Sequence, residues 1–78
     1  KLTKGDVYMM PLKLANVGEE LTIQRIAGLP AVKAHLADLG FVVGANVTIV
    51  SGIDGNIIVN VKGSRIALGE DMAMKIFV

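Results

Sequence analysis

The only histidine of the chain lies close to a carboxylate. His35 and Asp38 are three residues apart in a segment with helical periodicity, and residues at i and i+3 of a helix are neighbours. Imidazole and carboxylate groups are ligands of divalent transition metals. The pair supplies two ligands at most, and the alternative is a solvated ion pair worth about 0.2–0.5 kcal/mol. We therefore expect no resident cofactor, with weak binding of a divalent metal at His35 and Asp38 as the alternative.

Other residues that could carry catalysis do not form a recognisable set. The chain has two serines and one histidine on different predicted elements, which does not indicate a nucleophilic triad. The acidic pairs Glu19-Glu20 and Glu70-Asp71 are adjacent, so their side chains diverge on a strand and suit turns or helix starts. The absence of cysteine excludes disulfides, thiolate zinc sites and cysteine nucleophiles. The sequence predicts a protein that is not an enzyme.

The composition favours a binding function instead. Apolar residues make up 53% of 78 residues, and the mean hydropathy is +0.60. A domain of this size hides only about 60% of the surface of its unfolded chain, so part of the apolar surplus is expected on the outside, where it marks an interface. The alternative is that the aliphatic residues fill a tight β core. An exposed apolar surface would also suit a homo-oligomer.

Charge and length exclude other classes of partner. Eight basic residues against seven acidic ones give a net charge of +1, and aromatic residues make up only 4% of the chain. Nucleic-acid binders concentrate Lys and Arg on one face and add aromatic side chains, so we expect no nucleic-acid partner. No apolar run reaches the 18 residues of a membrane span, and no signal peptide is visible. With no cysteine, a cytoplasmic location without membrane insertion is expected.

The first half of the chain reads as strand, then helix. Apolar residues at period two between Leu21 and Ile26 predict one strand. Pro30 suits the first turn of a helix. Val32, Leu36 and Leu39 form one stripe of that helix, and Gly40 can end it in a left-handed conformation.

The second half reads as a meander of short strands. Alternating apolar residues predict strands near residues 47–51, 57–61, 65–68 and 74–78, with an Asp54-Gly55 hairpin turn, a Lys62-Gly63 turn and one helical turn near residues 70–73. Met72 and Met74 are expected to pack inside. Five to six short strands with one short helix inserted after the first strands predict a mainly β fold, a small SH3-like barrel that closes to protect its edges.

The domain is expected to span residues 12–78, with Leu12, Leu14 and Val17 beginning its regular structure. Residues 1–11 lack periodicity and are predicted to be an N-terminal arm or an extra edge element. A helical turn, an edge strand and a flexible arm remain open for this segment.

Apolar residues in predicted loops are the candidate protein-interaction residues. Leu29 lies between strand and helix, Phe41 and Val42 follow the helix, and Ile53 is at a hairpin tip. Loops run over the protein surface, and His35 on the helix could extend the same patch. The alternative is that these side chains fold back and plug the barrel ends.

The order of these motifs resembles the FeoA family, small cytoplasmic accessory proteins of bacterial ferrous iron uptake. The resemblance rests on Leu14 with Gly18, residues 23–28, residues 36–40, Gly44 with residues 47–50, residues 59–63, residues 66–68, and Ala73 with Ile76 and Val78. It implies an SH3-like fold and a role in assisting the membrane transporter FeoB, whose cytoplasmic part is a GTP-binding domain. That domain is the implied partner, and it would bring this protein to the inner membrane.

Two positions depart from the family pattern. Val43 stands where a proline is common, and His35 stands where a larger basic residue is common. Both departures weaken the transfer of partner contacts by residue. A similar module forms the C-terminal part of some metal-dependent repressors. The alternative function is therefore a divalent-metal-binding SH3-like module, a fragment related to those repressors.

Overall fold

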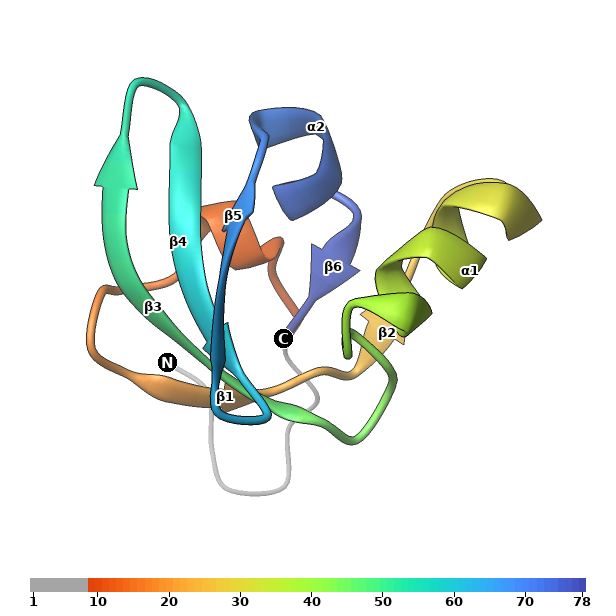
Figure 1. Cartoon of the computed structure of the whole chain (residues 1–78), viewed down its shortest axis with the longest axis horizontal. Coiled ribbons are helices and arrows are strands. Elements are labelled where there is room, and N and C mark those ends of the chain that lie inside the picture. Colours follow the sequence, from red (N-terminus) through yellow and green to blue (C-terminus); the bar gives the residue numbers. More distant parts are fainter. Residues whose placement is uncertain (1–8) are drawn as a thin grey trace.

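Nine short elements follow one another in the computed structural model, which describes residues 9–78 (Figure 1). The order is η1 (Leu12–Leu14), β1 (Glu20–Thr22), β2 (Arg25–Ile26), α1 (Pro30–Asp38), β3 (Asn46–Ile53), β4 (Asn56–Val61), β5 (Ser64–Leu68), α2 (Glu70–Ala73) and β6 (Ile76–Phe77), where η1 is a 3-10 helix. The predicted mainly β, SH3-like fold with a helix after the first strands is confirmed.

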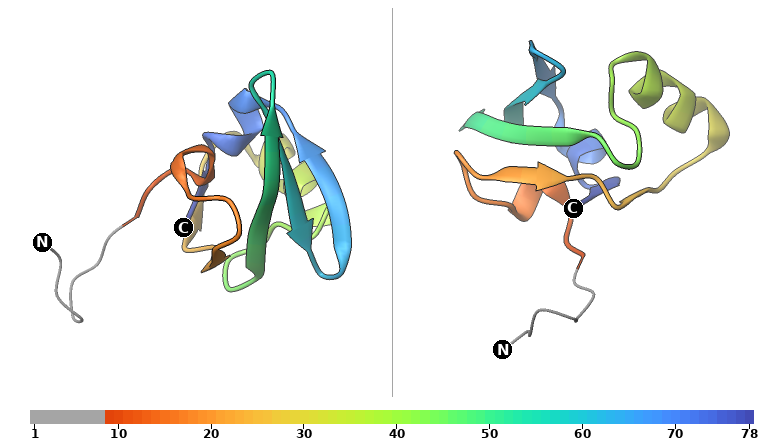
Figure 2. Two further views of the ribbon diagram at one scale, coloured as in Figure 1. Left: turned by 90° about the vertical axis from the view of Figure 1, so that its left-hand side faces the viewer. Right: turned by 90° about the horizontal axis from the view of Figure 1, so that it is seen from below.

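The strands form two antiparallel sheets. One has the order β1-β3-β4-β5, and the other pairs β2 with β6. The alternation of β4 places Ile57, Val59 and Val61 in the core, as a half-buried antiparallel strand requires. The two sheets curl around this core, and α1 projects from one side of the barrel (Figures 1 and 2).

The strand predicted between Leu21 and Ile26 is divided between the two sheets. The N–H of Ile23 donates to the carbonyl of Ala45 at 2.9 Å, whereas the next N–H, of Gln24, donates to the carbonyl of Phe77 at 2.7 Å. The chain thus leaves β3 and reaches β6 within one residue. This change of partner connects the two sheets and closes one corner of the barrel.

Two tight hairpins connect β3, β4 and β5. The central residues of the first turn, Asp54 and Gly55, have φ of 49° and 82°, and those of the second, Lys62 and Gly63, have φ of 50° and 79°. Positive φ at both central positions is the signature of a type I′ turn, whose twist matches that of the flanking strands. Both predicted turns are confirmed.

A bulge interrupts the pairing of β3 with β4. The register shifts between Ile49, which faces Val59, and Ser51, which faces Ile58. Val50 is therefore the extra residue. A bulge bends its strand and increases the local twist, and this one lies just before the hairpin end of β3.

The core gathers residues from nearly every element. The buried apolar residues are Leu12, Ile23, Leu36, Phe41, Val47, Ile49, Ile57, Val59, Val61, Leu68, Ala73, Ile76 and Val78. Met72 packs against this core, as predicted. The prediction that Met74 packs inside is wrong, since this residue follows the single turn of α2 and is 42% exposed. Leu14 and Val17, which lie in and after the short η1 turn, are exposed as well.

The first described residues pair with the C-terminus at the second sheet. The N–H of Met10 donates to the carbonyl of Val78 at 3.1 Å, and the N–H of Val78 donates back at 2.9 Å. Pro11 forms a bridge with Phe77. Residues 1–8 of the predicted N-terminal arm lie outside the described residues.

Helix α1 ends as its sequence predicts, at a glycine that no other residue replaces easily. Gly40 is buried with φ of +105°, and a Cβ there would lie 3.5 Å from a methyl group of Val61. We expect Gly40→Ala to lower the free energy of unfolding by about 1–3 kcal/mol because of backbone strain. Urea unfolding checks this, with Gly52→Ala as the control, since Gly52 has no positive φ. Equal stability of the two variants would contradict the strain.

Candidate interaction surface

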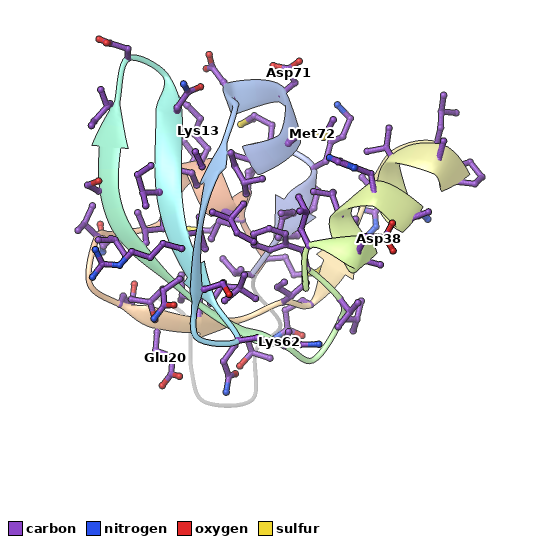
Figure 3. All side chains as sticks on the ribbon, viewed as in Figure 1. Lys13, Glu20, Asp38, Lys62, Asp71 and Met72 are labelled. Atoms are coloured by element: carbon purple, nitrogen blue, oxygen red, sulfur yellow. The ribbon has the colours of Figure 1, made fainter. Side chains whose placement is uncertain are left out.

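The ionisable groups are dispersed over the surface. Across residues 9–78, no three His, Cys, Asp or Glu side chains come together as a metal site would require. His35 and Asp38 are both exposed on α1, and Asp38 and Asp71 lie apart on two different helices (Figure 3). His35 and Asp38 therefore offer at most two ligands, where a closed structural zinc site takes four.

The described part of the chain also contains no buried polar or charged side chain. Catalytic acids and bases are commonly recognised by burial beside a specific charged partner, and no described side chain has that environment. Within residues 9–78, no helix is both long enough and apolar enough to cross a bilayer. The features that stand out are apolar side chains on the surface.

Leu29 is the most exposed of these side chains. It is 72% exposed and occupies the N-cap of α1, where it makes no capping hydrogen bond, with Pro30 in the first turn. Ser, Thr, Asp and Asn are strongly preferred at this position because their side chains bond to free N–H groups of the first turn. Leu29 thus exposes a large apolar side chain to solvent and also leaves the N-terminus of α1 without a side-chain cap. Departures of this kind from local sequence rules are expected at functional positions.

Val42 and Val43 lie at the other end of α1. The loop folds back tightly, since the N–H of Phe41 donates to Leu36 at 2.9 Å and the N–H of Ala45 donates to Val42 at 3.0 Å. This places Phe41 in the core at 0% exposure and leaves Val43 at 64%. The prediction that Phe41 is an interaction residue is therefore wrong. The alternative, in which the side chain folds back and fills the barrel, is correct for this residue.

We call Leu29, Val42 and Val43 the α1 surface, because they flank the two ends of this helix. A nine-residue helix is about 14 Å long, so one partner can contact both ends. Exposed His35 lies on the helix between them. The β3–β4 hairpin with Ile53 lies on the opposite side of the barrel (Figures 1 and 2). The predicted interaction residues thus belong to two surfaces.

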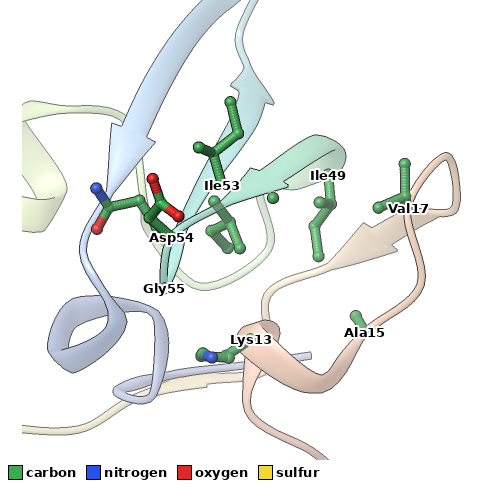
Figure 4. Close-up of a pocket in the computed structure, with 10 residues that line it drawn as sticks. Lys13, Ala15, Val17, Ile49, Ile53, Asp54 and Gly55 are labelled. Atoms are coloured by element: carbon green, nitrogen blue, oxygen red, sulfur yellow. The ribbon is translucent and has the colours of Figure 1, made fainter.

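The second surface is a groove below the β3–β4 hairpin (Figure 4). Its volume is about 320 Å³, and its lining residues are Lys13, Ala15, Val17, Ile49, Gly52, Ile53, Asp54, Gly55, Asn56 and Ile57. We call it the hairpin groove. Val17 and Ile53, which are 62% and 60% exposed, contribute apolar side chains to it. The sequence signal for Val17 was its position as a lone apolar residue among Asn16, Gly18 and Glu19, typical of a turn.

A polar hollow of about 360 Å³ lies on the four-stranded sheet, lined by Glu20, Ala45, Asn46, Thr48, Asn60, Lys62 and Gly63. Asn46 accepts a 2.9 Å hydrogen bond from the hydroxyl of Thr22. One acidic and one basic side chain line this hollow, Glu20 and Lys62, so their charges cancel. It differs in this respect from the basic surfaces that attract phosphate backbones.

A small barrel of this topology is an SH3-like domain. The FeoA domain family matches residues 10–78. The chain belongs to this family.

Named relatives agree with the assignment. A protein of Methanocaldococcus jannaschii, "Putative Fe(2+) transport protein A", is 38% identical over 71 residues, which are 90% of this chain and 85% of that protein. The crystal structure of an iron uptake regulatory protein (FeoA) is 26% identical, with a TM-score of 0.84 over 92% of this chain and 96% of that one. Zinc-complexed FeoA of Stenotrophomonas maltophilia, described as a prokaryotic SH3 domain protein, is 25% identical, with a TM-score of 0.76 over 86% of each chain.

The same fold occurs inside larger proteins. A manganese-dependent transcriptional repressor superposes on 90% of this chain with a TM-score of 0.82 and 22% identity, and only 40% of the repressor is covered. This similarity concerns the fold. The FeoA family is one of iron-transport accessory proteins and is not a family of known enzymes.

Proposed function

We propose that this protein is a non-enzymatic adaptor of ferrous iron uptake that binds the cytoplasmic GTP-binding domain of the transporter FeoB through the α1 surface. It acts in the cytoplasm and reaches the inner membrane through this partner. The observation that carries the assignment is membership of the FeoA family across residues 10–78. The relative from M. jannaschii is named for Fe(2+) transport.

The exposed side chains of the α1 surface support a protein partner. Burying a leucine side chain stabilises a complex by about 1.5–3 kcal/mol, and Leu29 is nearly free of contacts that would have to be broken first, since it is 72% exposed. Val42 and Val43 add apolar area at the other end of α1. Because α1 is fixed to the core by buried Leu36, this surface is pre-formed, which lowers the entropy lost on binding.

Isothermal titration calorimetry with the purified GTP-binding domain tests the adaptor function directly. We expect saturable binding with a negative heat-capacity change, because apolar burial produces this sign. The matched variants are Val43→Glu in the α1 surface and Val17→Glu outside it, since these valines are 64% and 62% exposed. Val43→Glu should weaken binding and Val17→Glu should not. Absence of heat at all temperatures with the wild-type chain would contradict the adaptor function.

Direct binding of a divalent metal is the second candidate. It is favoured by the zinc complex of the S. maltophilia FeoA and by His35 and Asp38, one helical turn apart on α1. The two side chains would leave most coordination positions to water, so affinity would be low. A metal that binds only the folded state raises its melting temperature.

We therefore expect a small rise in melting temperature with millimolar Fe(II), Mn(II) or Zn(II), and its loss in His35→Ala. Lys33→Ala on the same exposed helix is the control. A melting temperature unchanged by all three metals would exclude the second candidate and leave the adaptor function intact.

A further inference from the structure

The last part of β3 has a free backbone edge. β1 pairs with β3 only from Asn46 to Thr48, and the N–H of Gly18 donates to the carbonyl of Ile49 at 2.8 Å. Beyond this bond, within residues 9–78, β3 is paired only with β4. An unpaired edge is a template for an added strand.

Gly52 presents its backbone groups to this edge. The two-residue turn Asp54-Gly55 makes Ile53 and Asn56 a hydrogen-bonded pair. Hydrogen-bonded and non-bonded pairs alternate in an antiparallel ladder, so the N–H and C=O of Gly52, which faces Ile57, point away from β4. Neither group has another backbone partner among the described residues, and Gly52 is exposed.

The hairpin groove lies where a residue paired with Gly52 would send its side chain. Residues directly opposite each other on paired strands point to the same face. Ile57, opposite Gly52, points to the core face, so a new partner of Gly52 would direct its side chain to that face too. Ile49 and Ile57 line the groove there, and Gly52 has no side chain to fill it.

The groove is lined by one basic and one acidic side chain, Lys13 and Asp54, and of these only Lys13 has an ion-pair partner within residues 9–78. Glu70 is paired with Lys13 at 3.3 Å, and no salt bridge to Asp54 is found within residues 9–78. Asp54 lines the groove at the hairpin tip (Figure 4). Lysine or arginine next to an inserted apolar side chain would complement the carboxylate of Asp54.

We propose that the free edge at Gly52 and the hairpin groove bind an extended segment of a partner protein, which adds a short strand beside β3. A β-branched apolar residue of the segment pairs with Gly52 and enters the groove, and flanking basic residues face Asp54. Backbone hydrogen bonds supply affinity in this mode and the side-chain pocket supplies selectivity. The groove is separate from the α1 surface, so this interaction goes beyond the adaptor function and needs no transporter domain.

The test is an amide-resolved NMR titration with the blocked peptide acetyl-Lys-Lys-Val-Thr-Val-Lys-Lys-amide, together with the same peptide N-methylated at both valines. We expect the Gly52 amide proton to move downfield as it gains a hydrogen bond, with further shifts at Val17 and Ile53. The N-methylated peptide should bind at least about tenfold more weakly. Equal binding of the two peptides, or an unmoved Gly52 signal, would overturn the inference.

Two variants of Gly52 distinguish the loss of its hydrogen bond to the peptide from a loss of the folded structure. Gly52→Pro removes the N–H and is tolerated at a free edge, so peptide binding should fall at least about tenfold. Gly52→Ala keeps the N–H, and its Cβ would lie 3.7 Å from the Asn56 carbonyl and 3.9 Å from an Ile57 methyl, both ordinary contacts. It should keep most of the affinity. Melting curves verify that both variants fold, and if Gly52→Pro does not, the peptide pair alone decides.

Discussion

Replacing Phe41 with alanine is expected to lower the free energy of unfolding by about 3–5 kcal/mol. The side chain is fully buried, and the loop that carries it is closed by the 2.9 Å bond from its N–H to Leu36. The substitution leaves a cavity in the core. Since whole domains are stable by only about 5–15 kcal/mol, the variant should be close to unfolding at 37 °C.

Urea unfolding followed by circular dichroism measures this loss. Val43→Ala, two residues away in the same loop and 64% exposed, is the control and should change stability by less than about 0.5 kcal/mol. A Phe41→Ala variant as stable as this control would show that Phe41 is not part of the core. That result would return Phe41 to the candidate interaction residues.

Replacing Leu29 with aspartate should change stability and binding in opposite directions. Aspartate at the N-cap can accept a hydrogen bond from the first turn of α1, which is worth about 0.5–2 kcal/mol, and its charge interacts favourably with the helix N-terminus. The variant should therefore be at least as stable as the wild type. It should also lose about 30-fold or more in affinity for the GTP-binding domain, the effect of losing an interface residue worth about 2 kcal/mol.

The matched control for Leu29→Asp is Leu14→Asp. Leu14 is also a highly exposed leucine, at 64%, but it lies in η1 and not at α1. Its substitution should leave the affinity unchanged. If Leu29→Asp kept full affinity, Leu29 would not belong to the binding site; if it destabilised the protein, the account of its N-cap would be wrong.

Local sequence signals predicted the elements that depend on local physics. Pro30 and Gly40 delimit α1 because a missing N–H and a left-handed φ are properties of single residues. Asp54-Gly55 predicted its hairpin for the same reason. The division of the strand at Ile23 and the bulge at Val50 depend on contacts between segments distant in sequence, and no local pattern encodes them.

The candidate site also contains residues that local sequence predicted and residues that only the tertiary structure places. Leu29, Val42 and Ile53 were predicted as exposed residues from their positions beside turn residues, and all three are on the surface. Phe41 was predicted with them but is buried, because the tight return after Gly40 turns it toward Leu36. The free edge at Gly52 became visible only with the strand register, since an isolated glycine in a strand pattern indicates no more than a bulge or a close approach.

The most direct test of the adaptor function is an amide-resolved NMR titration of this domain with the GTP-binding domain of the transporter. We expect shifts that cluster at Leu29, His35, Val42 and Val43 and that disappear with Leu29→Asp. A spectrum that does not move at saturating concentrations of the GTP-binding domain would contradict the proposed function.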